Sequence, residues 1–194
     1  MITALVLAAG LSRRMGRPKL LLQLEGKAIL RWSVEGVLRH IADILVVTGP
    51  EDGAIRTALT GLAVRFVVNP RPDEGQGSSI ASGAAALGPM TDAVLVVLGD
   101  QPRLHPDVIP ALVEAGRRSG KPVIAPVYQG VQGTPVLFGA AVFPELRTLG
   151  GDTGARAIVQ RDPTRLELVS FDVPMPADVD TPADYARVKE PTPE

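Results

Sequence analysis

The chain has 194 residues, which is about one domain of ordinary size and enough to bury a substantial core. Its net charge of −1 at pH 7 excludes a globally basic nucleic-acid-binding protein, and the absence of cysteine excludes disulfides, thiolate metal sites and cysteine nucleophiles. No apolar run approaches the roughly 18 residues of a membrane span, and the first apolar run has no basic region before it. We therefore expect a soluble cytoplasmic protein that binds neither nucleic acid nor membrane.

Short runs rich in Val, Leu and Ile alternate along the chain with longer amphipathic stretches. The apolar runs predict strands covered on both faces, at residues 2–8, 43–48, 64–68, 93–98 and 122–126. The stretches between them have helical spacing, at residues 28–39, 51–60, 77–87 and 106–118. This alternation predicts an α/β fold with a mostly parallel sheet and right-handed crossovers. No linker interrupts it, so we expect a single domain over residues 1–194 with a loose tail at 190–194.

The second half of the chain departs from this alternation. Two close glycines in YQGVQGTPVLFG, residues 128–139, precede a strand-like run at 135–138 and indicate a hairpin or an antiparallel insertion. The remaining predicted elements are helices near 142–148 and 153–161, a strand at 166–171 and a final helix at 182–189. Ligands of open α/β sheets lie beyond the carboxyl ends of the strands, so the loops at 8–19, 69–79 and 99–102 should line one crevice.

The loop after the first strand combines small residues with a cluster of cations. Ala8, Ala9 and Gly10 let backbone amides approach a flat ligand, and Arg14 and Lys19 can neutralise phosphates. The four cations of the loop are Arg13, Arg14, Arg17 and Lys19. The loop matches neither the Walker motif nor the dinucleotide fingerprint. A solvated basic loop is the alternative interpretation.

Three aspartates are candidate ligands for a divalent cation. Asp100 follows a buried strand in VVLGDQP, where a carboxylate can hold Mg²⁺ together with substrate phosphates. Asp178 and Asp180, in ADVDTPADY, precede a predicted helix with Thr181 as its N-cap, and Asp180 can face Asp100 across the crevice. Each acid also has a structural alternative, because Asp100 can form a turn and one of the later pair can face the helix dipole.

Two further loops carry polar side chains. Ser78 and Ser79, within residues 69–83, can contact a base, ribose or phosphate, or serve only close packing of a helix on the sheet. GGDTGARAI, residues 150–158, is either a helix cap with a surface arginine or an anion site for a second substrate. Its polar residues are Asp152, Thr153 and Arg156.

Nucleophilic catalysis has no support in the sequence. The nucleophile elbow needs glycine at its last position, where this chain has Ala81. His105 precedes a proline at a helix start and is expected to be a surface residue.

The motifs together resemble a known family. LVLAAGLSRRMGRPKLLLQLEGKAIL, residues 5–30, resembles the signature of nucleotidyltransferases that share a Rossmann-like fold with nucleotide-sugar enzymes. GDQP, GDTGAR and DVDTPADY narrow the resemblance to the molybdopterin-type group, and in particular to the molybdenum cofactor cytidylyltransferases. The resemblance spans residues 2–189. It implies a three-layer α/β sandwich of the nucleotide-diphospho-sugar transferase type, with a mostly parallel sheet and an antiparallel strand.

The resemblance also implies a reaction. The terminal phosphate of molybdopterin attacks the α-phosphate of CTP, pyrophosphate leaves, and a cytosine dinucleotide cofactor results, with Mg²⁺ as the cofactor of the enzyme. Such a transfer depends mainly on positioning and charge neutralisation, so it needs no nucleophilic side chain. A molybdenum hydroxylase or its chaperone is the implied recipient of the product.

Site residues follow from the same resemblance. The backbone of Ala8, Ala9 and Gly10 would hold the base, and Arg14 and Lys19 the triphosphate. Asp100 would carry Mg²⁺, with Asp180 as the preferred second ligand and Asp178 as the alternative. Gly75 and Ser79 match family positions near the base and ribose. The implied catalytic residues are Lys19, Arg14 and Asp100.

Ala9 bears on the choice of nucleotide. The cytidylyltransferases tend to carry Ala-Ala-Gly where the guanylyltransferases carry Ala-Gly-Gly, and a methyl group at Ala9 narrows the pocket in favour of the smaller pyrimidine.

Two departures from the family concern the second substrate. Gly-Thr-Pro at 133–135 stands where members often show Gly-His-Pro, and Gln76 and Gly77 replace a Met and a Ser.

Three alternatives stay open at this point. The chain could use GTP, transfer the nucleotide to another phosphorylated acceptor, or carry molybdenum cofactor without catalysis. Lys19 and Asp100 argue against a pure carrier, because a carrier has no need of a site for a metal and a triphosphate.

Overall fold

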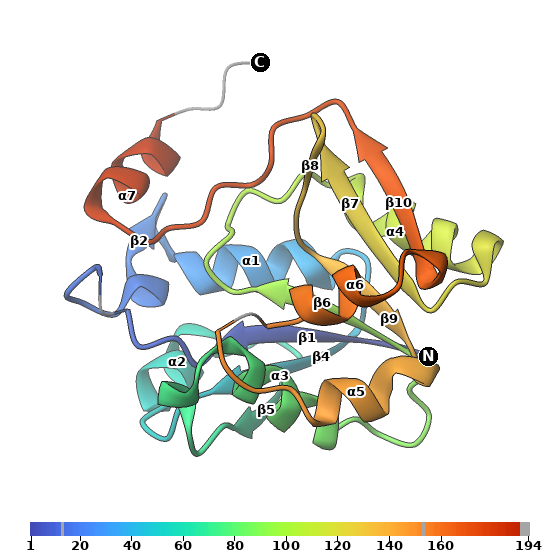
Figure 1. Cartoon of the computed structure of the whole chain (residues 1–194). Helices are drawn as coiled ribbons and strands as arrows, with labels where there is room; N and C mark the ends of the chain where they lie inside the picture. Colours follow the sequence, from blue (N-terminus) through green and yellow to red (C-terminus); the bar gives the residue numbers. More distant parts are fainter. Residues whose placement is uncertain (13, 153, 191–194) are drawn as a thin grey trace.

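The central sheet has eight strands, of which seven follow the order β10-β7-β9-β6-β1-β4-β5 while β8 pairs with β7 (Figure 1). The computed structural model describes residues 1–12, 14–152 and 154–190. Arg13, Thr153 and most of the expected tail at 190–194 therefore lie outside the described residues. The strands are β1 (Ile2–Ala8), β4 (Asp43–Thr48), β5 (Arg65–Val68), β6 (Ala93–Leu98), β7 (Val123–Tyr128), β8 (Val131–Gln132), β9 (Val136–Gly139) and β10 (Leu166–Phe171).

Seven α-helices are found in the described part of the chain. They are α1 (Ile29–Leu38), α2 (Gly53–Ala58), α3 (Gln76–Ala85), α4 (Val108–Ser119), α5 (Phe143–Arg147), α6 (Arg156–Arg161) and α7 (Pro182–Lys189). Single 3₁₀ turns lie at Lys19–Leu21, Pro72–Glu74, Ala140–Val142 and Pro163–Arg165. None of these helices has the length and hydropathy needed to cross a membrane.

Most predicted elements are present, with shifts of a few residues at their ends. The prediction missed a short hairpin formed by β2 (Gln23–Leu24) and β3 (Lys27–Ala28). Two-residue strands are too short to show periodicity, and the signal that was available is the Glu25-Gly26 turn, where both residues have positive φ. The prediction also started the helix near 153–161 too early, since α6 begins at Arg156.

The sheet is mostly parallel with one antiparallel strand inside it, which confirms the predicted fold class. β1 pairs in parallel with β4 and β6, and β7 pairs in parallel with β10. β9 lies between β6 and β7 and is antiparallel to both. The glycine-rich segment after β7 causes this reversal, because Gln129 and Gly130 both have positive φ and turn the chain into β8.

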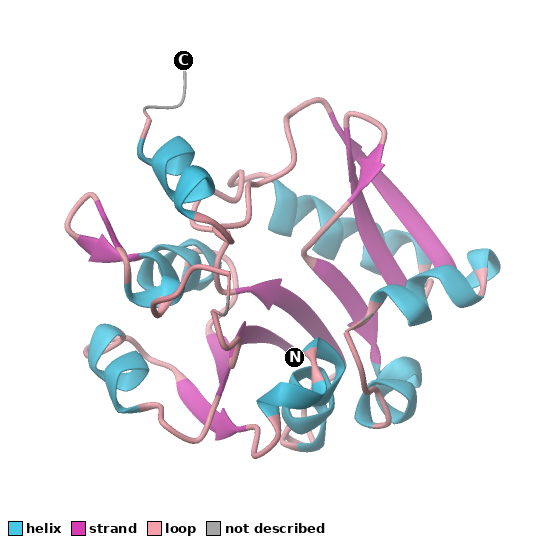
Figure 2. Cartoon of the chain, turned by 60° about the vertical axis from the view of Figure 1, so that its left-hand side comes forward, coloured by secondary structure: helices cyan, strands magenta, loops and turns pink. Residues whose placement is uncertain are grey.

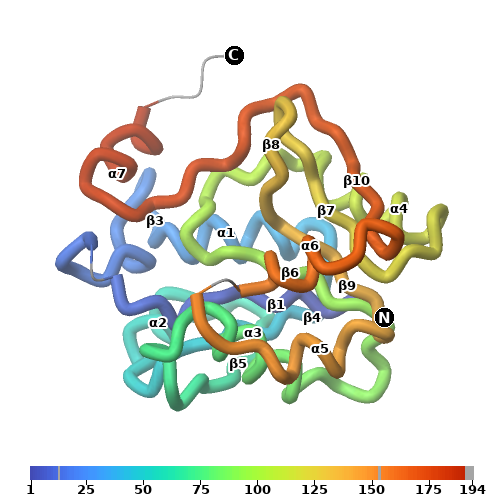
Figure 3. Tube along the Cα trace, viewed as in Figure 1, coloured from blue at the N-terminus to red at the C-terminus, as the bar shows by residue number. Residues whose placement is uncertain are grey.

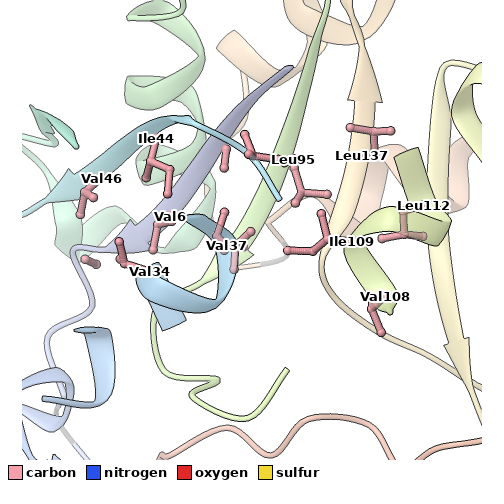
Figure 4. Close-up of a cluster of buried hydrophobic side chains, with 14 of the residues drawn as sticks. Val6, Val34, Val37, Ile44, Val46, Leu95, Val108, Ile109, Leu112 and Leu137 are labelled. Atoms are coloured by element: carbon pink, nitrogen blue, oxygen red, sulfur yellow. The ribbon is translucent and has the colours of Figure 1, made fainter. Parts of the chain in front are cut away.

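Helices cover both faces of the sheet, which gives three layers (Figures 1 and 2). Alternate residues of β1 point to opposite faces, so that Val6 belongs to one buried cluster and Leu5 to another. The cluster of Val6 includes Val34 of α1, which lies beside Val6, and extends to Leu112 of α4 (Figure 4). Leu5 packs with residues of α3, α5 and α6. The central strands β1, β4 and β6 are apolar on both faces because both faces are covered. The same prediction is wrong for the strand expected at 64–68, because β5 lies at the edge of the sheet and none of its residues is buried.

A segment far along the chain crosses the carboxyl ends of the strands. Residues 172–181 run from the end of β10 back across the molecule to α7, as the red part of the tube in Figure 3 shows. A third buried cluster fixes the end of this path, because Val179 and Val188 pack there with Met15 from the basic loop and Leu24 from the hairpin. The crossing segment is thereby held beside the loops that follow β1 and β6.

Two helix glycines provide a matched test of the packing between α3 and β1. A Cβ atom on Gly83 would lie 2.2 Å from Cδ1 of the fully buried Leu5, whereas a Cβ atom on Gly36 of α1 would meet nothing within 4 Å. Gly83→Ala should therefore lower the free energy of unfolding by about 1–3 kcal/mol through overpacking. Gly36→Ala should raise it by about 0.5–1 kcal/mol, because alanine costs less entropy in a helix. Urea unfolding measures the free energy of unfolding of the two variants. Equal changes in the two variants would contradict this description of the interface between α3 and β1.

Candidate active site

A cavity of about 590 Å³ lies at the carboxyl ends of β1 and β6. It brings together nearly all the residues that the sequence singled out. Those that line it are Ala9, Gly10, Arg14, Lys19, Gly75, Ser79, Asp100 and Asp180. Ala8 is the last residue of β1, and its side chain packs in the first buried cluster instead. The expected crevice therefore exists, and we call it the first cavity.

Lys19 joins the two predicted metal ligands in this cavity. Its Nζ lies 2.5 Å from Oδ2 of Asp100 and 2.6 Å from Oδ1 of Asp180, and Arg14 binds the other oxygen of Asp180 at 2.7 Å. Burial acts to lower the pKa of Lys19, but the charges and hydrogen bonds of the two carboxylates outweigh it, so that this pKa lies above its usual value. The ammonium group is therefore a stable part of the cluster.

Arg17, a third cation of the basic loop, contacts an aromatic ring instead of this cluster. Arg17 lies over the ring of Tyr185, with 5.8 Å between the guanidinium carbon and the ring centroid. Arg13 lies outside the described residues. The interpretation of the whole loop as a solvated basic face is wrong for Lys19, whose side chain is only 13% exposed.

Asp100 and Asp180 could hold a divalent cation. One oxygen of each carboxylate points at the same position, where the ammonium group of Lys19 now lies. Carboxylate oxygens are hard ligands, and Mg²⁺ is usually held by one or two of them together with substrate phosphates. The described residues contain no group of three or more side chains suited to a metal, so the phosphates would have to complete the coordination.

Asp178 and Asp180 lie on opposite sides of the crossing segment. Asp180 lines the first cavity, whereas Asp178 lines a second cavity of about 580 Å³. Between them, Val179 is fully buried, and its backbone N–H donates to the carbonyl oxygen of Asp100 at 3.1 Å. Because successive side chains of an extended segment point to opposite sides, the two carboxylates are separated. The first cavity therefore pairs Asp100 with Asp180.

The second cavity adjoins the first. Gln76, Leu98 and Asp152 line both of them. Arg156 of α6, one of the candidates for an anion site, lines the second cavity. Thr134 also lines it, from the Gly-Thr-Pro segment that departs from the family pattern. The two cavities meet at the end of β6, next to Asp100.

Sequence reasoning missed a buried polar residue that holds the loop after β5. Asn69 is 1% exposed, and its Nδ2 donates to the hydroxyl oxygens of Ser78 and Ser79 at 2.8 and 3.1 Å. Ser78 in turn donates to the carbonyl oxygen of Gly75 at 2.8 Å. Ser78 is therefore a structural residue, while Ser79 also lines the first cavity. The available signal was an amide side chain directly after a buried apolar run.

Gly75 and Gly77 allow a second loop to approach the start of α3. Gly75 has a φ of +91°, and a Cβ atom on it would lie 2.4 Å from Oδ1 of Asp152. The backbone N–H of Gly77 donates to the carbonyl oxygen of Gly151 at 2.9 Å, and a Cβ atom there would clash with the backbone of Gly150. These glycines bring Asp152 to the boundary between the two cavities.

The structure confirms the predicted cap of α7 and the predicted exposure of His105. Thr181 is the N-cap of α7, and its partner in the capping box is Asp184, so neither Asp178 nor Asp180 serves that helix end. His105 is half-exposed next to the start of α4 and lies outside both cavities, as expected for a surface residue.

Comparison with known proteins places this site in a family. The sequence profile described as the MobA-like NTP transferase domain matches residues 4–166. The chain belongs to this family. Its site is therefore that of a nucleotidyltransferase, and residues of this domain and of the segment after it line both cavities.

Curated relatives of this family differ in their described functions. The chain is 31% identical over 194 residues to the purine catabolism protein PucB of Bacillus subtilis, covering 94% of this chain and 93% of that protein. It is 27% identical over 190 residues to the molybdenum cofactor cytidylyltransferase of Escherichia coli, covering 97% and 96%. It is 35% identical over 115 residues to a probable molybdenum cofactor guanylyltransferase of Pelotomaculum thermopropionicum, covering 58% and 51%.

Solved structures agree with the fold. Rv0371c of Mycobacterium tuberculosis superposes with a TM-score of 0.85 at 29% identity, over 99% of this chain and 100% of that one. A structure of Rv0371c in complex with manganese superposes with a TM-score of 0.80 at 28% identity, over 96% of each chain.

The placement of Asp178 predicts an unusual effect on stability. Burial and the charge of Asp100 raise the pKa of Asp178 above its usual value, although its hydrogen bond from Gln101 opposes the shift. Ionised Asp178 therefore costs stability at pH values above its folded-state pKa, and this cost vanishes as pH falls below its unfolded-state pKa. Because Asp178 is exposed to solvent, which screens its interactions, Asp178→Asn should raise Tm at pH 7 by only a small amount, and the difference should shrink as pH falls toward 4. Asp172→Asn, at another exposed position of the same segment, is the control, and a lower Tm for Asp178→Asn at pH 7 would contradict the prediction.

Proposed function

We propose that this chain transfers CMP from CTP to the phosphate of molybdopterin or molybdenum cofactor and releases pyrophosphate, with Mg²⁺ as its cofactor. One observation carries the proposal: two adjoining cavities meet beside Asp100, and the first of them contains Lys19, Arg14 and Asp180. A nucleotide in the first cavity and a phosphorylated acceptor in the second would place their reacting phosphates at this junction. Positioning of this kind supplies much of the rate of a phosphoryl transfer.

The reaction needs no nucleophilic side chain. An oxygen of the acceptor phosphate forms a bond to the α-phosphorus, and the bond from that phosphorus to the bridging oxygen of pyrophosphate breaks, with its electron pair leaving on pyrophosphate. Lys19 and Arg14 would bind the triphosphate and stabilise the negative charge that develops on it. Asp100 and Asp180 would hold Mg²⁺, which neutralises charge on the phosphate oxygens when it is bound.

Lys19 must leave its present partners before it can serve this role. A divalent cation between Asp100 and Asp180 would occupy the position of the ammonium group. Like charges repel, so Lys19 would move toward the phosphates as the metal enters. The metal and the nucleotide would therefore bind with positive coupling, because the phosphates accept the cation that the carboxylates release.

CTP is favoured over GTP by the turn after β1. Ala9 lines the first cavity and is 5% exposed, so its methyl group occupies space that a glycine would leave to a larger base. The similarity to the cytidylyltransferase of E. coli, over nearly the full length of both chains, supports the same choice.

A molybdenum hydroxylase or its chaperone is the proposed recipient of the product, and the cytoplasm is the proposed location.

Replacing Lys19 should strengthen metal binding in the absence of nucleotide. Lys19→Met removes a cation that competes for the two carboxylates, and we expect roughly three- to tenfold tighter binding of Mn²⁺, the effect of about 1 kcal/mol. Electron paramagnetic resonance of free Mn²⁺ measures the dissociation constant of the metal. Lys27→Met is the matched control, because Lys27 pairs with Glu35 away from both cavities. Unchanged or weaker Mn²⁺ binding by Lys19→Met would contradict the proposed competition between Lys19 and the metal for the two carboxylates.

Pyrophosphate release tests the proposed reaction directly. The purified protein with Mg²⁺ and molybdopterin should release pyrophosphate with CTP and much less with GTP, ATP or UTP. Lys19→Met and Asp100→Asn should each lower the rate by at least about 100-fold, since both remove charge stabilisation from the transition state. Lys27→Met should keep the wild-type rate. Ala9→Gly should gain activity with GTP relative to CTP.

The outcomes separate the alternatives. Faster pyrophosphate release with GTP than with CTP would indicate that the protein transfers GMP instead of CMP. Release only with a different phosphorylated acceptor would keep the nucleotide half of the proposal and replace the acceptor. Folded protein that binds molybdopterin but releases no pyrophosphate with any nucleotide would indicate a carrier of the cofactor.

A further inference from the structure

The three charged side chains that meet in the first cavity come from three separate segments. Lys19 begins a 3₁₀ turn that leads into the β2–β3 hairpin, Asp100 follows β6, and Asp180 precedes α7. The Nζ atom of Lys19 lies 2.5 Å from Asp100 and 2.6 Å from Asp180. These contacts require the hairpin, the turn after β6 and α7 to keep fixed positions relative to one another.

Arg103 connects the three segments. It belongs to the turn after β6, in the same loop as Asp100. Its Nε donates to the carbonyl oxygen of Val188 in α7 at 3.0 Å, and its Nη2 donates to Oε1 of Glu25, in the turn between β2 and β3, at 2.8 Å. One side chain of the turn is thereby bonded both to α7 and to the hairpin.

The bond from Arg103 satisfies the carboxyl end of α7. The last four carbonyl groups of a helix have no partner within it, and Val188 lies in the last turn of α7. A cation is also favoured at this end of a helix by the helix dipole. At the other end, the backbone N–H of Val179 donates to the carbonyl oxygen of Asp100 just before α7 begins. The turn at 100–103 therefore holds α7 at both ends.

Glu25 has a backbone conformation that glutamate does not favour. Glu25 and Gly26 have φ values of +49° and +79°, and a tight hairpin turn of this kind prefers Asn, Asp or Gly at both positions. The left-handed conformation is strained for other residues because of their Cβ atom. The ion pair with Arg103 gives the glutamate side chain a function at this position.

The hairpin and α7 also contact each other directly (Figure 1). The hydroxyl of Tyr185 in α7 donates to the carbonyl oxygen of Gln23 in β2 at 2.6 Å. Leu24 of the hairpin packs with Val188 in the third buried cluster. Arg103 therefore joins two elements that already touch to the turn that carries Asp100.

We propose that Arg103 is a positioning residue for the pair of carboxylates, Asp100 and Asp180. By holding α7 and the hairpin against the turn after β6, it maintains the separation of the two carboxylates. Arg103 is not among the described residues that line the two cavities, so it acts through these segments and does not touch a ligand. The inference rests on the proposed function, because it takes the two carboxylates as metal ligands.

Metal binding distinguishes a positioning role from an effect of charge. Removal of a nearby cation favours a bound metal ion, whereas loss of alignment between its two carboxylates disfavours it. The test uses the Lys19→Met background, in which no ammonium group competes for the carboxylates. Adding Arg103→Met to this background should weaken Mn²⁺ binding roughly three- to tenfold, as measured by electron paramagnetic resonance of free Mn²⁺. Equal or tighter binding would overturn the proposal.

Trp32 provides a local readout that does not depend on metal. It is the single tryptophan of the chain, and its Nε1 donates to the carbonyl oxygen of Leu24 in β2 at 2.6 Å. Arg103→Met alone should raise the Stern–Volmer constant for acrylamide quenching of Trp32 about twofold, because the hairpin opens more often. Tm should change little, since an exposed ion pair contributes little to global stability. Unchanged quenching in the folded variant would overturn the role of Arg103 at the hairpin.

Glu25→Asn separates the ion pair from the turn. Asparagine suits a positive φ better than glutamate, so this variant removes the contact with Arg103 and relieves the backbone. Quenching of Trp32 should rise as it does in Arg103→Met. Unchanged or lower quenching would show that Glu25 acts only as a turn residue and would overturn the bridge to the hairpin.

Arg65→Met is the matched control. It removes another exposed arginine, which pairs with Asp43 at 2.9 Å at the start of β4, and neither residue lines a cavity described above. It should leave both the Mn²⁺ affinity in the Lys19→Met background and the quenching of Trp32 unchanged. Effects as large as those of Arg103→Met would overturn the assignment. Thermal unfolding verifies that each variant is folded.

The two proposals can fail separately. If Arg103→Met weakens Mn²⁺ binding but the wild-type protein releases no pyrophosphate with any nucleotide, the proposed transfer is overturned and the role of Arg103 is kept. If the wild type releases pyrophosphate but Arg103→Met leaves Mn²⁺ binding unchanged, the transfer is kept and the role of Arg103 is overturned.

Discussion

The hydrogen bond from the backbone N–H of Val179 to the carbonyl oxygen of Asp100 connects the two ends of the site. It ties the segment that crosses the sheet to the turn that follows β6. Val179 is fully buried in the third cluster, so the bond is shielded from water and its loss would leave polar groups unpaired. Because side chains alternate about this point, Asp178 and Asp180 fall into different cavities. One backbone contact therefore separates the carboxylate of the first cavity from that of the second.

Ion pairs within the first cavity keep its opposite charges balanced when no ligand is bound. A cavity that is to bind a triphosphate and a divalent cation needs both cations and carboxylates, and each set alone would repel itself. In this structure Lys19 and Arg14 neutralise Asp100 and Asp180 directly. Pairs of this kind are stable only while both partners stay together, since removing one leaves a buried charge. Under the proposed function the same arrangement would allow exchange, because a nucleoside triphosphate with its metal ion would bring both an anion for Lys19 and a cation for the carboxylates.

The antiparallel strand β9 gives the site its second half. The first cavity lies at the carboxyl ends of β1 and β6, in the parallel part of the sheet. β9 enters next to β6 in the opposite direction, so the residues before it, including Gln132 and Thr134, arrive at the same edge of the sheet. The reversal in the chain therefore brings polar side chains to the second cavity.

The fold class and most residues of the first cavity could be predicted from the sequence. Apolar runs of strand length alternate with helical stretches, and parallel strands end at one edge of the sheet, which brought the loops of Lys19 and Asp100 together in the prediction. These inferences succeed because hydrophobic periodicity and crossover handedness are local rules with few exceptions. The short hairpin escaped them, because two residues show no period.

The assignment of Asp178 and Asp180 to their cavities, and the burial of individual polar residues, follow from the packing of the folded chain. Asp178 and Asp180 are two residues apart in a segment without regular structure, so nothing local fixes where they point. Asn69 bonds to two serines across the loop that precedes α3, and Gln101 bonds to Asp178 from a segment 77 positions later in the chain. The pairing of Lys19 with Asp100 spans 81 positions of sequence. Such contacts depend on packing between elements, and the sequence of each element does not contain that information.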